Sequence, residues 1–153
     1  MKPSETAHRL HSLVDFTTRK LSAISEEESL VTRGQGKWTR KQILGHLIDS
    51  SLNNIHRFIR ARQEENFRFP DYDQPLWVKS SGYNDRSWSS LIQLWSDLNE
   101  HLAEIIERIP EDRLETRCTI GENKPVTLGF IVSDYSTHLN HHLEQILDPK
   151  GSG

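Results

Sequence analysis

Apolar side chains recur every three or four residues in four separate segments, and this spacing constrains the fold of the chain more than any other feature. The period is that of an α-helix that buries one face. We expect such helices at about 4–25, 39–63, 87–109 and 127–146. The chain is therefore predicted to be all-α, a bundle of four amphipathic helices in a single domain.

Helix-start signals support three of these boundaries. Thr39 is followed three residues later by Gln42, which matches a capping box, and Ser87 and Thr127 stand where N-caps are expected. The three glutamates at 26–28, between the first two helices, are predicted to be a solvated linker.

The connections between the later helices differ in character. Residues 66–85 show no helical period and hold Pro70, Pro75 and Gly82 among several aromatic side chains. We expect a long aromatic loop there, which either closes over a binding site or serves only as a packing strap. Residues 117–126 are predicted to form a short hairpin or turn before the last helix.

Length and composition set outer limits. The 153 residues suit one domain, predicted at 1–150, with 151–153 as a linker remnant or frayed end. A net charge of −3 offers no basic field, so we expect no nucleic-acid partner. The single cysteine, Cys118, excludes an internal disulfide and fits a reducing cytoplasm. With no apolar run of about 20 residues and no secretory pattern, we expect a cytoplasmic protein without a membrane partner.

Two histidines of the last predicted helix have the spacing of metal ligands. His138 and His142 lie one turn apart, about 40° round the axis, and His142 falls within the apolar stripe. Zinc proteases use this i, i+4 pair in H-E-x-x-H, but the glutamate is missing here, so a protease is not expected. His141 points away from the pair. The alternative is a hydrogen-bonded core histidine with no ligand role.

A third ligand would have to come from a facing helix. His46 is the candidate, on the side of the second helix that also carries Gln42, Asp49 and Asn53. Periodicity makes this a polar face, either solvent or the wall of a polar pocket, and by itself it favours solvent.

Taken together, three stretches of the chain resemble the DinB-like superfamily, including its YfiT-like candidates for metal-dependent hydrolysis. They are WTRKQILGHLID at 38–49, TLGF at 127–130 and DYSTHLNHHLEQI at 134–146. The resemblance implies a four-helix bundle with a divalent metal ion, often nickel or zinc, held by His46, His138 and His142. Many relatives have Glu where this chain has Gln42, a change that removes an acid or base beside the ligands.

The resemblance implies a small-molecule substrate, since the superfamily includes transferases that use low-molecular-weight thiols, thiol-dependent isomerases and proteins named hydrolases by analogy. A three-histidine metal can activate water or a thiol. Asp49 and Asp134 are the carboxylates nearest to the candidate ligand histidines by helical spacing. Each could act as a proton shuttle, orient a ligand imidazole, or be a surface charge with no role in the site. Asn53, Tyr72 and Trp77 are the predicted substrate-binding residues.

Two other interpretations stay open. One is a non-catalytic bundle that binds metal or a partner, which the loss of the glutamate favours. The other is a structural homodimer formed through the face that carries Trp88 and Trp95, if that face is exposed.

Overall fold

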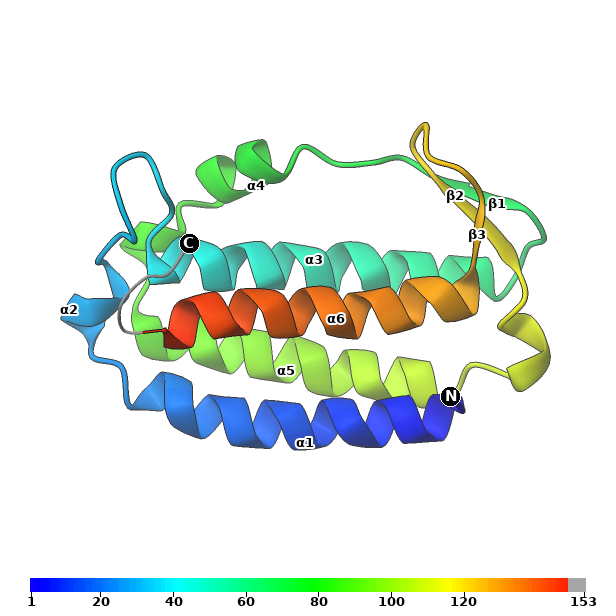
Figure 1. Ribbon diagram of the computed structural model, residues 1–153, viewed down its shortest axis with the longest axis horizontal. Coiled ribbons are helices and arrows are strands. Elements are labelled where there is room, and N and C mark those ends of the chain that lie inside the picture. Colours follow the sequence, from blue (N-terminus) through cyan, green and yellow to red (C-terminus); the bar gives the residue numbers. More distant parts are fainter. Residues whose placement is uncertain (149–153) are drawn as a thin grey trace.

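Within residues 1–148, which the computed structural model describes, four long helices form a bundle (Figure 1). They are α1 (Pro3–Ser22), α3 (Arg40–Ala61), α5 (Trp88–Glu107) and α6 (Leu128–Leu147). α3 and α6 lie side by side and run in opposite directions (Figure 1). The predicted four-helix bundle is confirmed, while the predicted domain end at 150 and the tail 151–153 lie outside the described residues.

The predicted helix starts are confirmed by their hydrogen bonds. Thr39 and Gln42 form the complete capping box of α3, because each side chain accepts from the other residue's backbone N–H. The Ser87 hydroxyl accepts from the backbone N–H of Ser90, and the Thr127 hydroxyl accepts from that of Phe130. The start of α6 determines towards which side of the helix His138 and His142 point.

The acidic run at 26–28 is not a linker, so that prediction was wrong. It opens the short helix α2 (Glu26–Ser29), capped by Ser25. Glu26 accepts from the backbone N–H of Trp88 and forms an ion pair of 2.8 Å with Lys41. Lys41 is only 3% exposed, and a buried ammonium needs a counterion. Glu26 therefore connects α2 to the starts of α3 and α5.

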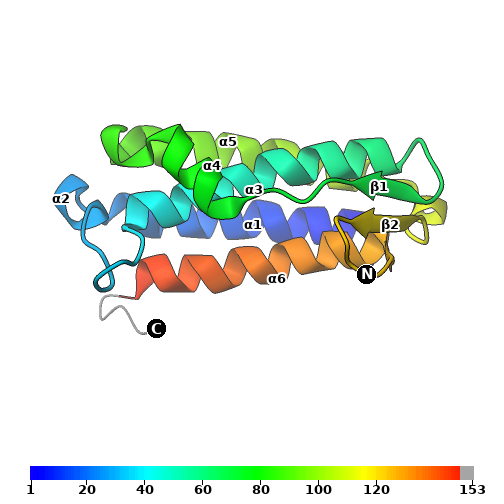
Figure 2. The ribbon, with the colours of Figure 1, turned by 90° about the horizontal axis from the view of Figure 1, so that it is seen from above.

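The segment at 66–85 is more ordered than the predicted loop. It contains β1 (Phe67–Phe69), helix α4 (Gln74–Ser81) and a 3-10 turn, η1 (Tyr83–Asp85). The sequence pattern did not predict α4, because a helix with only one buried residue, Val78, has no apolar stripe. The helix ends at Gly82, whose φ of 65° is in the left-handed region. Figure 2 shows this segment returning along α3, which it contacts at both α4 and η1.

A small sheet closes one end of the bundle. β2 (Arg117–Ile120) pairs antiparallel with β3 (Val126–Thr127), which confirms the predicted hairpin, and a 3-10 turn η2 (Glu111–Arg113) precedes it. β1 adds to β2 in parallel, with Phe67 opposite Cys118. The aromatic segment was therefore missed as a strand because its pairing partner lies some 50 residues away along the sequence.

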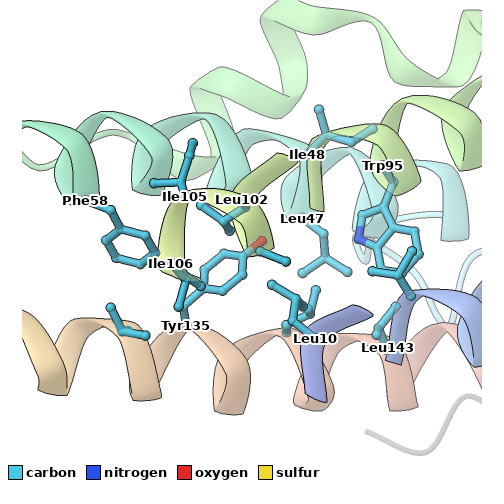
Figure 3. Packing of buried hydrophobic residues seen from close by; sticks show 14 of the residues in the cluster. Leu10, Leu47, Ile48, Phe58, Trp95, Leu102, Ile105, Ile106, Tyr135 and Leu143 are labelled. Atoms are coloured by element: carbon cyan, nitrogen blue, oxygen red, sulfur yellow. The ribbon is translucent and has the colours of Figure 1, made fainter. Parts of the chain in front are cut away.

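The core between the helices is apolar and closely packed, as Figure 3 shows around Leu47, Phe58 and Trp95. Trp88 and Trp95 are both buried, at 3% and 0% exposure, so they offer no outward face for the predicted dimer. Among the described helices, none is both long and apolar enough to span a membrane.

Candidate metal centre and adjoining pocket

Three histidines from two facing helices converge at one point. His46 comes from α3, and His138 and His142 come from α6. One ring nitrogen from each lies within 4.8 Å of the other two. The ring centroids are 5.3, 4.8 and 4.5 Å apart for the pairs 46–138, 46–142 and 138–142. We call these three residues the histidine cluster.

The two α6 histidines already have nearly the separation that a shared ion requires. Their Nε2 atoms are 3.1 Å apart. Two nitrogens bound to one tetrahedral zinc ion at about 2.05 Å would be about 3.3 Å apart. The Nδ1 of His142 lies 2.9 Å from the Oε1 of Gln145, and donation to that oxygen leaves Nε2 free to bind an ion. His141 is exposed and lies outside the cluster.

His46 is buried at 1% exposure, so the preference for solvent drawn from periodicity was wrong. The polar face of α3 is covered by α4 and η1, the segment that periodicity did not detect. The Nδ1 atom of His46 is buried and has no hydrogen-bond partner within residues 1–148. The Trp38 ring packs against it at 5.2 Å. An imidazole with an unpaired buried nitrogen fits a residue that binds an ion.

Burial keeps all three imidazoles neutral. Burial, with smaller contributions from the neighbouring His142 and His138, lowers the pKa of His46 to about 4. Burial also lowers the pKa of His138 and of His142. Neutral imidazole is the form that binds metal, so at neutral pH the three histidines are in the protonation state that a divalent ion requires.

A buried carboxylate lies one turn along α3 from His46. Asp49 is 1% exposed, and its Oδ1 accepts a hydrogen bond of 2.5 Å from the Tyr83 hydroxyl. Its Oδ2 is buried without a partner in the described chain. Burial raises the pKa of Asp49 to about 6, although the Tyr83 hydrogen bond acts in the opposite direction. Such a carboxyl can exchange a proton near neutral pH.

Sequence reasoning missed Tyr83, and Gly45 was the signal that could have found it. A Cβ at position 45 would lie 2.0 Å from the Tyr83 ring, so the ring packs directly on the α3 backbone. This contact brings the Tyr83 hydroxyl to Asp49 on the next turn. A glycine inside a helix lowers its stability, so a close approach of this kind is a good reason for its presence.

A cavity of about 170 Å³ adjoins the cluster at His138. It lies between α3 and α6, beneath the segment that follows β1. Its walls are formed by Ser50, Asn54, Arg57, Asp71, Tyr72, Gln74, Ile120, Val126, Phe130, Ile131, Asp134, Tyr135 and His138. Such a mixture of apolar walls and a few polar groups is typical of small-molecule sites.

Some of the predicted catalytic and substrate-binding residues line the cavity, and others lie outside it. Tyr72 and Asp134 line the cavity. Asn53 does not, because its side chain donates to the Asp49 carbonyl at 2.8 Å, and Asn54 lines the cavity instead. Trp77 lies outside the wall and packs its ring edge-on against Tyr72 at 5.3 Å. Gln42 has its side-chain oxygen on the Thr39 backbone N–H, so it serves the helix cap.

A family model described as the DinB superfamily matches residues 6–146. A candidate metal-dependent hydrolase of Oceanobacillus iheyensis is 25% identical over 146 residues, covering 93% of this chain and 84% of the relative. A second from the same organism is 27% identical over 143 residues, covering 94% and 83%. These relatives are named as metal-dependent, and this chain has a histidine cluster able to hold an ion.

Two solved structures share the fold. YfiT from Bacillus subtilis, described as a candidate metal-dependent hydrolase with an unusual four-helix bundle topology, matches with a TM-score of 0.78 at 19% identity, covering 92% of this chain and 83% of that one. The mycothiol-dependent maleylpyruvate isomerase matches with a TM-score of 0.75 at 13% identity, covering 95% and 61%. At these identities the likeness concerns the fold.

Proposed function

This chain belongs to the DinB superfamily, and from that premise we propose that it is a metal-dependent enzyme acting on a small molecule. His46, His138 and His142 hold one divalent ion, zinc or nickel, since imidazole suits both metals. The observation that carries the proposal is the meeting of three ring nitrogens within 4.8 Å, beside a cavity that shares His138.

The bound ion would supply an open position at which water or a thiol loses its proton more readily. The chain's own residues supply the rest. Tyr72 and Asn54 hold the substrate against the cavity wall, and Trp77 supports the Tyr72 ring. Asp49, with its pKa raised to about 6, stores or releases a proton beside His46. Asp134 lines the cavity one turn before His138 and is the second candidate catalytic carboxylate.

Two reaction types fit this arrangement. Hydrolysis is the first, because the relatives in sequence carry that name. Transfer of a low-molecular-weight thiol is the second, because an enzyme of the same fold is described as mycothiol-dependent. The cytoplasmic location remains a proposal, drawn from the single cysteine. A homodimer also remains a proposal, without a face assigned to it.

Metal analysis of the unchelated protein tests the site. We expect about one divalent ion per chain, with His138→Ala and His142→Ala each losing most of it. His141→Ala is the matched control, since this exposed neighbour lies outside the cluster, and it should retain the ion. Equal loss in all three variants, or no ion in the parent protein, would overturn the proposal.

Activity measurements then separate the reactions. Turnover of electrophilic acceptors that requires both metal and added thiol would indicate thiol transfer, and ester or amide hydrolysis without thiol would indicate a hydrolase. In either case Asp49→Asn should lower turnover while the metal content stays unchanged.

The non-catalytic alternative rests on Gln42, which is engaged in the helix cap and supplies no acid. A cobalt-substituted protein whose spectrum responds to neither thiols nor small anions would favour that alternative.

A further inference from the structure

The cavity beside the histidine cluster has a charged group at its far end. His46, Ser50, Asn54 and Arg57 follow one face of α3 at steps of four, four and three residues. At 1.5 Å per residue, the Cα atoms of His46 and Arg57 are about 16 Å apart along the helix axis. Helical side chains lean towards the N-terminus, so Arg57 reaches back into the cavity that Asn54 and Ser50 also line.

Arg57 is the one described arginine or lysine that lines this cavity, and no carboxylate of the described residues forms a salt bridge with it. It is partly buried, and burial lowers its pKa. Within residues 1–148, the Arg57 guanidinium forms neither an ion pair nor a hydrogen bond. The Tyr72 ring lies 5.9 Å from the guanidinium carbon. A partly desolvated guanidinium whose N–H donors are not taken up by a carboxylate favours binding of an anion.

The surroundings limit what that anion can be. Ile120, Val126 and Ile131 provide apolar wall for an organic body. Asp71 and Asp134 are exposed acids on the same cavity, and Asp71 is close enough to raise the pKa of Arg57. A phosphate with about two negative charges would meet one cation and two acids. A carboxylate carries a single charge and matches the planar guanidinium with two parallel hydrogen bonds.

We propose that Arg57 is the substrate-anchoring residue of this cavity and that it selects a small organic molecule bearing a carboxylate. The carboxylate binds at Arg57, the apolar part lies along the β2–β3 and α6 walls, and the remainder extends towards His138. Because the cavity adjoins the proposed metal site, this role rests on the proposed function. Binding at Arg57 does not itself require the ion.

Titration of the metal-free, chelator-treated protein with isovalerate, followed by backbone amide shifts in NMR spectra, tests this role. Isovalerate is small enough for a cavity of about 170 Å³. We expect saturable shifts at residues around the cavity, and no such shifts with the neutral isosteric amide. Arg57→Gln should weaken isovalerate binding by about tenfold to a hundredfold, the range for hydrogen bonds to a charged group. Arg57→Lys should retain part of the affinity.

Arg60→Gln is the matched control. Arg60 lies three residues further along α3, is exposed, stacks on Phe67 and does not line the cavity. It should bind isovalerate like the parent protein. Equal affinity in Arg57→Gln and the parent, no binding to the metal-free protein, or tighter binding of inorganic phosphate than of isovalerate would each overturn the proposal. If the protein holds no metal but isovalerate binding still depends on Arg57, the anchoring role stands and the metal proposal fails.

Discussion

The bundle contains two polar clusters that both include residues of α3 and α6, and they differ in how fully their polar atoms are hydrogen-bonded. The core polar cluster joins Ser51 of α3, Tyr135 of α6 and Asn99 of α5. The Tyr135 hydroxyl donates to the Asn99 side-chain oxygen, and the Asn99 amide donates to Ser51 at 3.1 Å and to the Trp95 carbonyl at 2.9 Å. Figure 3 shows Tyr135 enclosed by apolar side chains.

The histidine cluster and its neighbour Asp49 lie within two turns of those same residues but are left incomplete. His46 Nδ1 and Asp49 Oδ2 are buried without partners among the described residues, whereas no side-chain atom of the core polar cluster is left so. Buried polar atoms without partners lower stability, and those that lie together beside a cavity are candidates for binding a ligand. The difference fits a structural role for the core polar cluster and the proposed metal-binding role for the histidine cluster.

Asn99→Ala should give the largest effect on stability. It removes two donated bonds and one accepted bond, takes one partner each from the Tyr135 hydroxyl and from Ser51, and opens a small cavity. We expect a loss of about 4 kcal/mol in the free energy of unfolding, measured by chemical denaturation. Metal content per folded chain should not change. Gln93→Ala, an exposed amide on the same helix, should cost less than about 0.5 kcal/mol. A similar loss in both variants would contradict the structural role of the core polar cluster.

Asp49→Asn should have the opposite sign, because it removes a buried charge. The pKa of Asp49 is raised from 3.8 to about 6, so the ionised group disfavours folding fully above pH 6. That penalty shrinks as the pH falls and is absent below 3.8, where both the folded and unfolded states hold the proton. The variant should stabilise the metal-free protein by about 2–3 kcal/mol at pH 8 and by almost nothing at pH 3.5.

Denaturation curves at the two pH values measure this effect, with Asp15→Asn on the exposed face of α1 as the control. A gain at pH 8 together with lower turnover would identify Asp49 as a group retained for function at the expense of stability. No gain would mean that the carboxylate is adequately compensated in the folded chain.

The two clusters also differ in how far the sequence predicted them. Helical spacing and N-caps predicted the long helices, and the i, i+4 spacing placed His138 and His142 on neighbouring turns before any tertiary contact was known. His46 was assigned towards solvent by spacing alone, because the covering segment contains α4, whose single buried residue gives no stripe. The resemblance to a known family, and not periodicity, joined His46 to the pair.

Contacts between distant segments could not be predicted. Tyr83 reaches Asp49 across 34 residues, and Asn99 reaches Ser51 across 48. Spacing within one helix cannot specify such partners. Asn53 and Asn54 differ by one residue, about 100° of helix rotation, which decides whether a side chain faces the cavity. Spacing separates these two directions, but it does not show which of them faces the cavity.

Gln145→Ala should give the smallest effect and sharpen the contrast, since it removes the hydrogen-bond partner of His142 Nδ1. The Gln145 side-chain oxygen lies 2.9 Å from His142 Nδ1 and fixes which ring nitrogen carries the proton. Without it, the His142 ring is free to turn and Nε2 is no longer reserved for the ion, so zinc affinity should fall about tenfold. Competition with a chromophoric chelator measures this change. Gln145→Glu keeps an acceptor at that position and should bind zinc at least as tightly as the parent, while Glu144→Ala, an exposed neighbour, should leave the affinity unchanged. If Gln145→Ala and Glu144→Ala bind zinc equally well, His142 is oriented by packing alone and its hydrogen bond to Gln145 does not contribute to zinc affinity.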